Sequence, residues 1–416
     1  MGYFPKLNDI IEAHQRLKGC VNHTSLMRSD NLSRKHCADI LLKREDLQVV
    51  RSYKLRGAYN KILSLTAEER ERGVVCASAG NHAQGVAFSC NRLSIKGYIY
   101  MPVTTPKQKI DQVRIHGNGM VEIILTGDTF DASAAEAKAF CEEHNMCFVH
   151  PFDDEKIIEG QATVGVEIIE DSTAPIDYIF VPIGGGGLLA GVGSYLKQVS
   201  PKTKIIGVEP AGAASMKAAL DNNGVVTLDE VDKFVDGASV KRVGDLNFEV
   251  GRQILDSIIT VPEGMICTTI LEMYNREAIV VEPAGALSIA ALGLCPEDIQ
   301  GKRVVCVVSG GNNDITRNED IKERSLLFEG LKHYFIVRFP QRAGALKTFL
   351  SEVLGPNDDI TFFEYKKKTH RENGPALIGI ELSDRNDFPA LLERMEDYGV
   401  KYEYLNHKQD LFELLI

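Results

Sequence analysis

Short apolar, β-branched runs alternate with helical segments through most of the sequence. "VVCASA" is followed by "NHAQGVAFSCNRL", "VEIILTG" by "DASAAEAKAFCEEH", and "YIFVPIG" by "GLLAGVGSYLKQV". The alternation continues to "KRVVCVVSGGN", which ends near residue 312. Because a strand that returns parallel to its predecessor needs a crossover, usually a helix, this order predicts α/β units around open, mostly parallel sheets.

The pattern changes after a charged helix expected at about 318–329. "HYFIVRF", "AGALKTFLSEVL", "DITFFEYKKKT", "ALIGIELS", "FPALLERMEDYGV" and "KYEYL" read as strand, helix, strand, strand, helix, strand. That order predicts a ferredoxin-like βαββαβ module after the α/β body. The three lysines Lys366, Lys367 and Lys368 are expected at a solvated strand end or hairpin.

The bulk composition favours small-molecule chemistry in a cytoplasmic protein. The net charge of the 416 residues is −11 and the basic residues are scattered, which argues against a nucleic-acid partner. The nine cysteines are odd in number and form no CxxC pair, so we expect reduced thiols. No apolar run approaches the length of a membrane span.

A lysine stands at the start of an expected helix in "RSYKLRGAYN", residues 51–60. Ser52 is expected to cap the helix, and Lys54 would then lie in its first turn, at the positive end of the helix dipole. A cation is electrostatically misplaced there. Taken alone, Lys54 is either a solvated first-turn lysine or a functional amine.

Two further loops join a strand to a helix. "SAGNHAQG", residues 78–85, either binds an anion such as a substrate carboxylate or is a tight packing turn, and His82 is expected to be structural. "PIGGGGLLAG", residues 182–191, has four consecutive glycines, whose backbone amides suit a phosphate. A dinucleotide fingerprint stays open, because Glu209 partly mimics its acidic residue.

Ser309 stands where the apolar run "VVCVV" ends, and ligands of open α/β sheets bind at that end of the strands. Taken together, the lysine, the asparagine loop, the tetraglycine loop and the strand-end serine resemble the fold-type II pyridoxal-phosphate enzymes, and within them the threonine dehydratases. The C-terminal βαββαβ is similar to an ACT-like regulatory domain. One such module fits after residue 330, as in the biosynthetic short form.

The resemblance implies a domain division and a set of roles. It implies a catalytic domain at 1–320 with two open twisted α/β subdomains, the smaller at roughly 45–150, then a linker at 321–331 and the ACT-like domain at 332–416. Lys54 would hold pyridoxal 5'-phosphate as a Schiff base and act in catalysis. The other cofactor contacts would be Asn81, Gly184, Gly185, Gly186, Gly187, Leu188 and Ser309, and the substrate contacts Ser78, Ala79, Gly80, Asn81 and His82.

The implied reaction is deamination of L-threonine to 2-oxobutanoate and ammonia, the first step of isoleucine biosynthesis. It would proceed by removal of the α-proton and elimination of the β-hydroxyl. Alternatives are a serine/threonine dehydratase of catabolic type, another β-eliminating enzyme of this fold, or a catalytically silent amino-acid sensor. Ala79 cannot donate a proton as the second serine of the related serine racemase does, so we expect no racemisation.

The resemblance also bears on partners. Isoleucine or valine is the expected effector of the C-terminal module, unless the module serves only dimerisation. A homotetramer or a dimer is expected. Related enzymes bind a cation near the glutamate that Glu209 matches, but "AGAAS" follows Glu209 without a carboxylate, so we expect no metal site.

Overall fold

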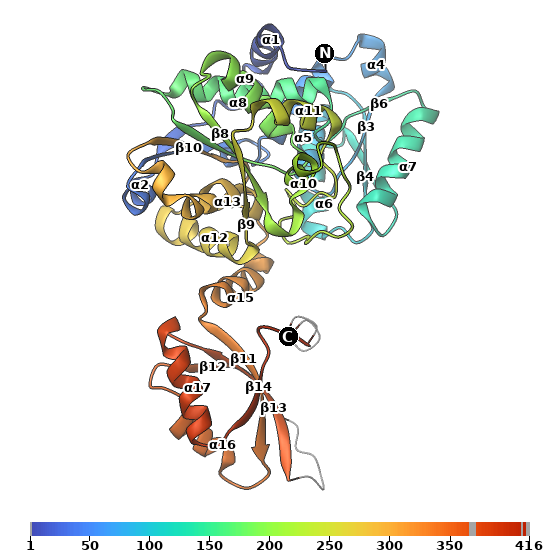
Figure 1. Ribbon diagram of the computed structural model, residues 1–416. Helices are drawn as coiled ribbons and strands as arrows, with labels where there is room; N and C mark the ends of the chain where they lie inside the picture. Colours follow the sequence, from blue (N-terminus) through green and yellow to red (C-terminus); the bar gives the residue numbers. More distant parts are fainter. Residues whose placement is uncertain (1, 366–371, 409–410, 413–416) are drawn as a thin grey trace. The chain divides into compact units, whose positions relative to one another are not determined.

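The computed structural model describes residues 2–365, 372–408 and 411–412 (Figure 1). The chain forms two compact units, Met1–Asp314 and Ile315–Ile416. The first unit contains two separate sheets and the second contains one. Lys366, Lys367 and Lys368, expected at a strand end or hairpin, lie outside the described residues.

The large sheet of the first unit has six strands in the order β1-β2-β10-β7-β8-β9. β1 pairs antiparallel with β2, and all other pairings are parallel. The latest strand in the sequence, β10, therefore lies between β2 and β7, in the interior of the sheet. The strands are β1 (Leu26–Arg28), β2 (Asp39–Arg44), β7 (Tyr178–Pro182), β8 (Lys204–Pro210), β9 (Ser257–Val261) and β10 (Arg303–Val308).

The small sheet of the first unit has four parallel strands in the order β5-β4-β3-β6. Its sequence falls between β2 and β7, so the chain leaves the large sheet, builds the small one and returns. The strands are β3 (Val74–Ala77), β4 (Gly97–Met101), β5 (Val121–Leu125) and β6 (Cys147–Phe148).

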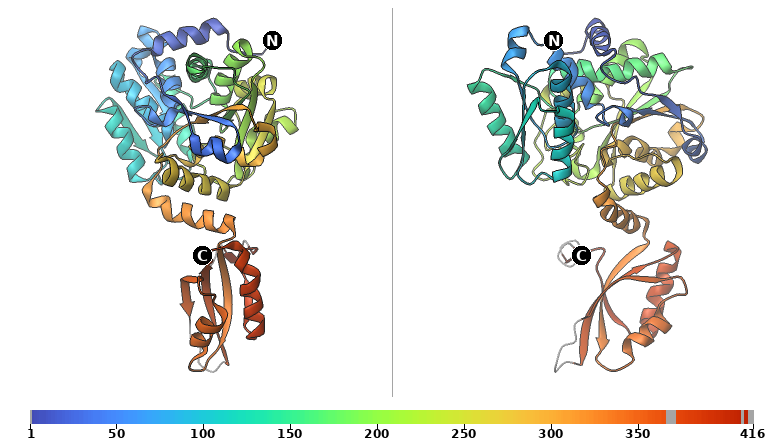
Figure 2. Two further views of the ribbon diagram at one scale, coloured as in Figure 1. Left: turned by 90° about the vertical axis from the view of Figure 1, so that its left-hand side faces the viewer. Right: turned by 180° about the vertical axis from the view of Figure 1, so that it is seen from behind.

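Helices cover both sheets of the first unit (Figures 1 and 2). Those around the large sheet are α1 (Leu7–Leu17), α2 (Asp30–His36), α8 (Glu155–Asp171), α9 (Gly187–Val199), α10 (Ser215–Asp221), α11 (Asp245–Ile254), α12 (Glu263–Glu277), α13 (Pro283–Ala290) and α14 (Pro296–Ile299). Those of the small-sheet region are α3 (Lys54–Leu63), α4 (Ala67–Arg72), α5 (Asn81–Leu93), α6 (Lys107–Gly117) and α7 (Phe130–Glu143). β7 is buried almost throughout, as expected for a strand that is covered on both faces.

The second unit begins with a 3-10 helical turn at Ile315–Arg317 and α15 (Asn318–Glu329), and it continues as a βαββαβ module. Its antiparallel sheet has the order β12-β13-β11-β14, which is the ferredoxin-like order. The elements are β11 (Lys332–Pro340), α16 (Ala345–Thr348) with a π-helical turn at Phe349–Val353, β12 (Asp359–Tyr365), β13 (Asn373–Glu381), α17 (Phe388–Asp397) and β14 (Lys401–Tyr404). The finer domain bounds expected at residues 45, 150, 320 and 332 stay predictions.

Candidate active site

Lys54 is the first residue of α3 and so lies in the first turn of the helix, as the sequence predicts. The predicted N-cap is wrong, because Tyr53 takes that position and makes no side-chain capping bond. Ser52 instead forms an isolated antiparallel β-bridge with Gly310, which lies just after the end of β10. Its hydroxyl is buried with no hydrogen-bond partner among the described residues.

Backbone hydrogen bonds connect the turn before Lys54 with the segment that follows β10. The Tyr53 amide donates to the Ser309 carbonyl at 3.2 Å, and the Gly311 amide donates to the Arg51 carbonyl at 2.9 Å. Arg51 adopts a positive φ of 57°, a conformation that non-glycine residues rarely take. These bonds place Lys54 beside the carboxyl end of the large sheet.

The Lys54 amine lies in a partly buried environment. Its Nζ donates to the Pro151 carbonyl at 2.7 Å. Burial lowers the pKa of Lys54 to about 8, and the negative charge of Glu282 offsets part of that effect. A substantial fraction of the amine is therefore neutral near physiological pH, which suits both imine formation and removal of a proton from carbon.

The segment after β6 connects Lys54 with the tetraglycine loop. Lys54 Nζ lies 5.9 Å from the ring centroid of Phe152. A Cβ atom on Gly185 would lie 2.2 Å from Cγ of that ring, and one on Gly187 would lie 2.9 Å from the Phe152 carbonyl oxygen. Glycine is therefore required at these positions, because any side chain would collide with the segment that holds the lysine.

The tetraglycine loop is oriented to present backbone amides. The Gly185 carbonyl accepts from the Gly244 amide at 3.1 Å and from Asn247 Nδ2 at 2.8 Å. Because a trans peptide directs its N–H opposite to its C=O, the Gly186 N–H points away from these donors. Gly187 and Leu188 open α9, where the first amides have no partner within the helix. The loop and the helix end thus form an anion cradle.

The asparagine loop places its residues at the start of α5, whose first residue is Asn81. Ser78, Ala79 and Gly80 are half-buried, and a Cβ atom on Gly80 would meet no neighbour within 4 Å. His82 donates through Nε2 to the Val149 carbonyl at 2.9 Å. Burial and the nearby Lys54 charge lower the pKa of His82 to about 3, so this ring is neutral.

Glu282 and Asn312 lie at this site, and neither was predicted from the sequence. Asn81 Nδ2 donates to Glu282 Oε1 at 2.6 Å, and Asn312 Nδ2 donates to Asn81 Oδ1 at 2.7 Å. Burial, and then repulsion by Asp236, raise the pKa of Glu282 to about 7. The available signal was the acidic residue of "VVEPAGAL", which stands between an apolar run and a proline that opens a helix.

Ser309 is buried at the end of β10. Its Oγ donates to the Ala284 carbonyl at 3.2 Å, the longest of the side-chain hydrogen bonds described at this site. A hydroxyl held this loosely can turn to another acceptor, such as an unprotonated ring nitrogen.

Pyridoxal phosphate carries a phosphate, an aldehyde, a ring hydroxyl and a ring nitrogen, and the chain offers one feature of suitable chemistry for each. The amide cradle of the tetraglycine loop suits the phosphate, the Lys54 amine the aldehyde, Asn81 the hydroxyl and Ser309 the nitrogen. The residues therefore fit this cofactor.

No group of three or more His, Cys, Asp or Glu side chains is placed to hold a metal ion within the described ranges. Glu209, at the end of β8, accepts the backbone amides of Met216 and Lys217 at 2.7 and 2.9 Å. Burial raises the pKa of this carboxyl to about 7.

Comparison with known sequences covers both units. Residues 17–310 match the family described as pyridoxal-phosphate-dependent enzymes, and residues 323–415 match the C-terminal regulatory domain of threonine dehydratase. The biosynthetic L-threonine dehydratase IlvA of Halalkalibacterium halodurans is 57% identical over 411 residues, which cover 99% of each chain. The enzyme of the same name from Bacillus subtilis is 58% identical over 99% of this chain and 97% of its own.

Solved structures share the fold of about three quarters of this chain. The processed form of threonine deaminase isoform 2 from Solanum lycopersicum is 37% identical, with a TM-score of 0.73 over 78% of this chain and 96% of that one. Maize serine racemase is 31% identical, with a TM-score of 0.72 over 78% of this chain and 98% of that one. The chain belongs to the biosynthetic L-threonine dehydratases, a family of fold-type II pyridoxal-phosphate enzymes with a C-terminal regulatory domain.

Proposed function

We propose that the chain deaminates L-threonine to 2-oxobutanoate and ammonia, as the first step of isoleucine biosynthesis. The observation that carries the proposal is the similarity to relatives named biosynthetic L-threonine dehydratases, which extends over both units. When bound, pyridoxal phosphate supplies an electron-accepting ring that stabilises negative charge at the substrate α-carbon.

Residues of this chain would remove the α-proton, bind the phosphate and contact the ring nitrogen. The Lys54 amine, whose neutral form is favoured by burial, removes the proton from the α-carbon. Backbone amides of Gly184 to Leu188 hold the phosphate. Ser309 would offer the ring nitrogen a neutral hydroxyl rather than a carboxylate, an environment that would favour loss of the β-hydroxyl over transamination.

The substrate contacts stay a proposal for the segment Ser78 to His82. Its half-buried backbone stands at the N-terminus of α5, where a carboxylate is stabilised by unpaired amides and by the helix dipole. The open space at Gly80 leaves room for a substrate beside Asn81. His82 supports the segment from behind through its bond to Val149.

Steady-state turnover of threonine and serine tests the proposed function. We expect 2-oxobutanoate from L-threonine to form faster than pyruvate from L-serine, and neither product with Lys54→Ala. The wild-type protein should show a visible absorption band that Lys54→Ala lacks. A coloured protein that turns over serine alone would favour the serine dehydratase alternative, and a colourless wild type would favour the sensor.

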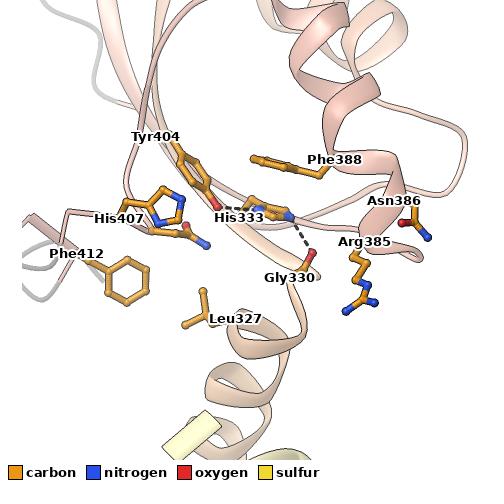
Figure 3. A pocket seen from close by; sticks show the side chains of 10 residues that line it. Leu327, Gly330, His333, Arg385, Asn386, Phe388, Tyr404, His407 and Phe412 are labelled. Atoms are coloured by element: carbon orange, nitrogen blue, oxygen red, sulfur yellow. Dashed lines mark hydrogen bonds between the residues drawn. The ribbon is translucent and has the colours of Figure 1, made fainter. Parts of the chain in front are cut away.

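We propose isoleucine or valine as the effector of the C-terminal unit. A cavity of about 780 Å³ opens within this unit beside His333, Phe388 and Tyr404 (Figure 3). His333 stacks on Phe388 at 3.9 Å between ring centroids, and Leu327 adds an apolar wall. Arg385, also in the lining, offers a cation to a carboxylate. An amino acid with an apolar side chain has the matching chemistry.

Effector binding is tested by threonine turnover with and without isoleucine or valine. We expect one of them to change the activity of the wild type, and Arg385→Ala to require a higher effector concentration. No response of the wild type to either amino acid would leave dimerisation as the role of the unit.

We further propose a cytoplasmic homo-oligomer, a tetramer or a dimer. All nine cysteines lie in the described part of the chain and all are free thiols, as expected in a reducing compartment. None of the described helices is long and apolar enough to cross a membrane.

Phe362, Phe363 and Tyr365 are exposed on β12, an edge strand that a second copy can cover. Light scattering of Phe363→Glu should show a smaller assembly than the wild type.

A further inference from the structure

The side-chain amide of Asn81 is held at both ends. Its Nδ2 donates to Glu282 Oε1 at 2.6 Å, while its Oδ1 accepts from Asn312 Nδ2 at 2.7 Å. An amide nitrogen has two hydrogens, so one N–H of Asn81 remains after the bond to Glu282. The two contacts therefore determine both the position of the amide and the group that it has left to offer.

The polarity of this chain of hydrogen bonds is fixed by the groups at its ends. Asn312 Nδ2 also donates to the Val50 carbonyl at 2.8 Å, and a backbone carbonyl can only accept. A reversed Asn81 amide would turn its oxygen toward the Glu282 carboxylate and its NH2 group toward that of Asn312. Both bonds would be lost, so the network assigns one orientation of the amide.

The pocket around Glu282 closely encloses its carboxyl group. Besides Asn81, the backbone amide of Asn312 hydrogen-bonds the carboxyl group. A Cβ atom on Gly310 would lie 2.3 Å from Oε1, and one on Gly237 would lie 3.5 Å from it. The charged or titratable groups that face Glu282 are Asp236, Lys109, Lys54 and Tyr53. A buried carboxyl of this kind is stable only when it is hydrogen-bonded, and here its partners include Asn81.

We propose that Glu282, together with Asn312, is a positioning residue that locks the Asn81 amide with its free N–H toward the ring hydroxyl of the cofactor. The inference rests on the cofactor role proposed for Asn81. An N–H that donates to the ring oxygen stabilises the ionised oxygen, whereas a reversed amide would accept from the hydroxyl and favour its protonated form. Glu282 thereby acts on the electronic state of the ring through Asn81.

The test compares holoenzymes of the wild type, Glu282→Asp and Asn312→Ala. Neither variant changes the net charge of the site. Glu282→Asp withdraws the carboxyl group that accepts from Asn81 Nδ2, and Asn312→Ala removes the amide that donates to Asn81 Oδ1. We expect the pH midpoint at which the visible cofactor band titrates to rise by about one pH unit in both, because the ring oxygen loses a hydrogen bond to its ionised form. We expect kcat for threonine to fall about tenfold, with a smaller change in KM.

Glu209→Asp is the matched control, because it removes the same methylene from a buried carboxylate whose partners are the amides of Met216 and Lys217. It should leave the titration midpoint unchanged. A wild-type midpoint in folded Glu282→Asp or in Asn312→Ala would overturn the inference. If Glu282→Asp fails to fold, Asn312→Ala decides alone.

The outcomes also separate this inference from the proposed function. A wild-type protein with the cofactor band but without threonine turnover would overturn the proposed reaction and leave the inference standing, since its readout is the band. A wild-type protein without the band would overturn both.

Discussion

The lowered pKa of Lys54 makes the rate of cofactor capture depend on pH. Burial lowers this pKa from 10.5 to about 8, so the neutral amine that attacks an aldehyde increases up to about pH 8. When pyridoxal phosphate is added to the cofactor-free protein, we expect the visible band to form about tenfold faster per pH unit below 8 and to level off above it. Stopped-flow absorbance measures this rate. A rate that still rises steeply at pH 10 would indicate an ordinary, exposed lysine.

The helix that begins with Lys54 is held by a buried cluster of charges. Arg56 Nη1 lies 2.6 Å from Glu167 Oε1, Arg56 Nη2 lies 2.7 Å from Glu45 Oε1, and Lys43 Nζ lies 2.6 Å from Glu167 Oε2. Since these side chains are 3% exposed or less, removal of one partner leaves a buried charge uncompensated.

Glu167→Gln should therefore lower the free energy of unfolding at pH 7 by about 3–5 kcal/mol. Burial alone would raise the pKa of Glu167, but the charges of Arg56 and Lys43 outweigh it and lower the pKa to about 2. The stabilisation is present above the unfolded pKa of about 4.5 and is lost as the pH falls toward 2. Thermal unfolding at several pH values should show the two proteins converging in acid, with surface Glu12→Gln as a control that behaves like the wild type.

At the scale of elements, the tetraglycine loop depends on close backbone approaches. A Cβ atom on Gly184 would lie 2.9 Å from the Cα of Ala238 and 3.0 Å from its carbonyl oxygen, so the backbone must shift to admit it. We expect Gly184→Ala to weaken binding of pyridoxal phosphate about tenfold, through the 1–3 kcal/mol that overpacking costs. Equilibrium titration of the absorption band measures the affinity.

Gly224→Ala is the control for the loss of a glycine, because a Cβ atom there would meet its nearest neighbour at 4.0 Å. Equal cofactor affinity for Gly184→Ala and the wild type would contradict the role of the loop as a cradle for the phosphate.

The sequence predicted the type and order of the main elements because their patterns are local. The alternation of β-branched runs and helices indicated α/β units around parallel sheets, and the six C-terminal segments indicated the βαββαβ order, whereas the division into two subdomains came from the family resemblance. Lys54 was placed correctly in the first turn of α3, but the predicted N-cap was wrong. Ser52 has the chemistry of a cap, yet the bridge to Gly310, from a segment more than 250 residues away, decides its conformation.

The Asn81 network could not be predicted for the same physical reason. Glu282 and Asn312 lie 201 and 231 residues after Asn81, and no local pattern reports a contact between them. The contact joins the start of α5, which follows β3 of the small sheet, with a segment that follows β10 of the large sheet, and helix and strand periodicity do not determine how two separate sheets meet. The roles of the motif residues themselves came from the family resemblance, and they stay predictions until the variants are measured.

At the scale of the whole molecule, the two compact units suggest separable tasks. Residues 1–314 form one compact unit with buried cores of its own, and the second unit has a separate core that includes Phe335 and Ile378. We expect a chain that ends at Asp314 to bind the cofactor and turn over threonine at a comparable rate, but without a response to isoleucine or valine. Assays beside the full-length protein check this, and a truncated chain that fails to fold would show that the second unit is needed for stability.

The interior position of β10 in the large sheet affects the order in which the protein can fold during synthesis on the ribosome. The ribosome synthesises β2 and β7 long before Arg303–Val308, so the large sheet has an unfilled gap while most of the chain is already outside the exit tunnel. Ser309, Gly310 and Asn312 emerge later still. The nascent chain can therefore fold its small sheet early, but it cannot complete the vitamin B6 pocket until Asn312 has left the exit tunnel.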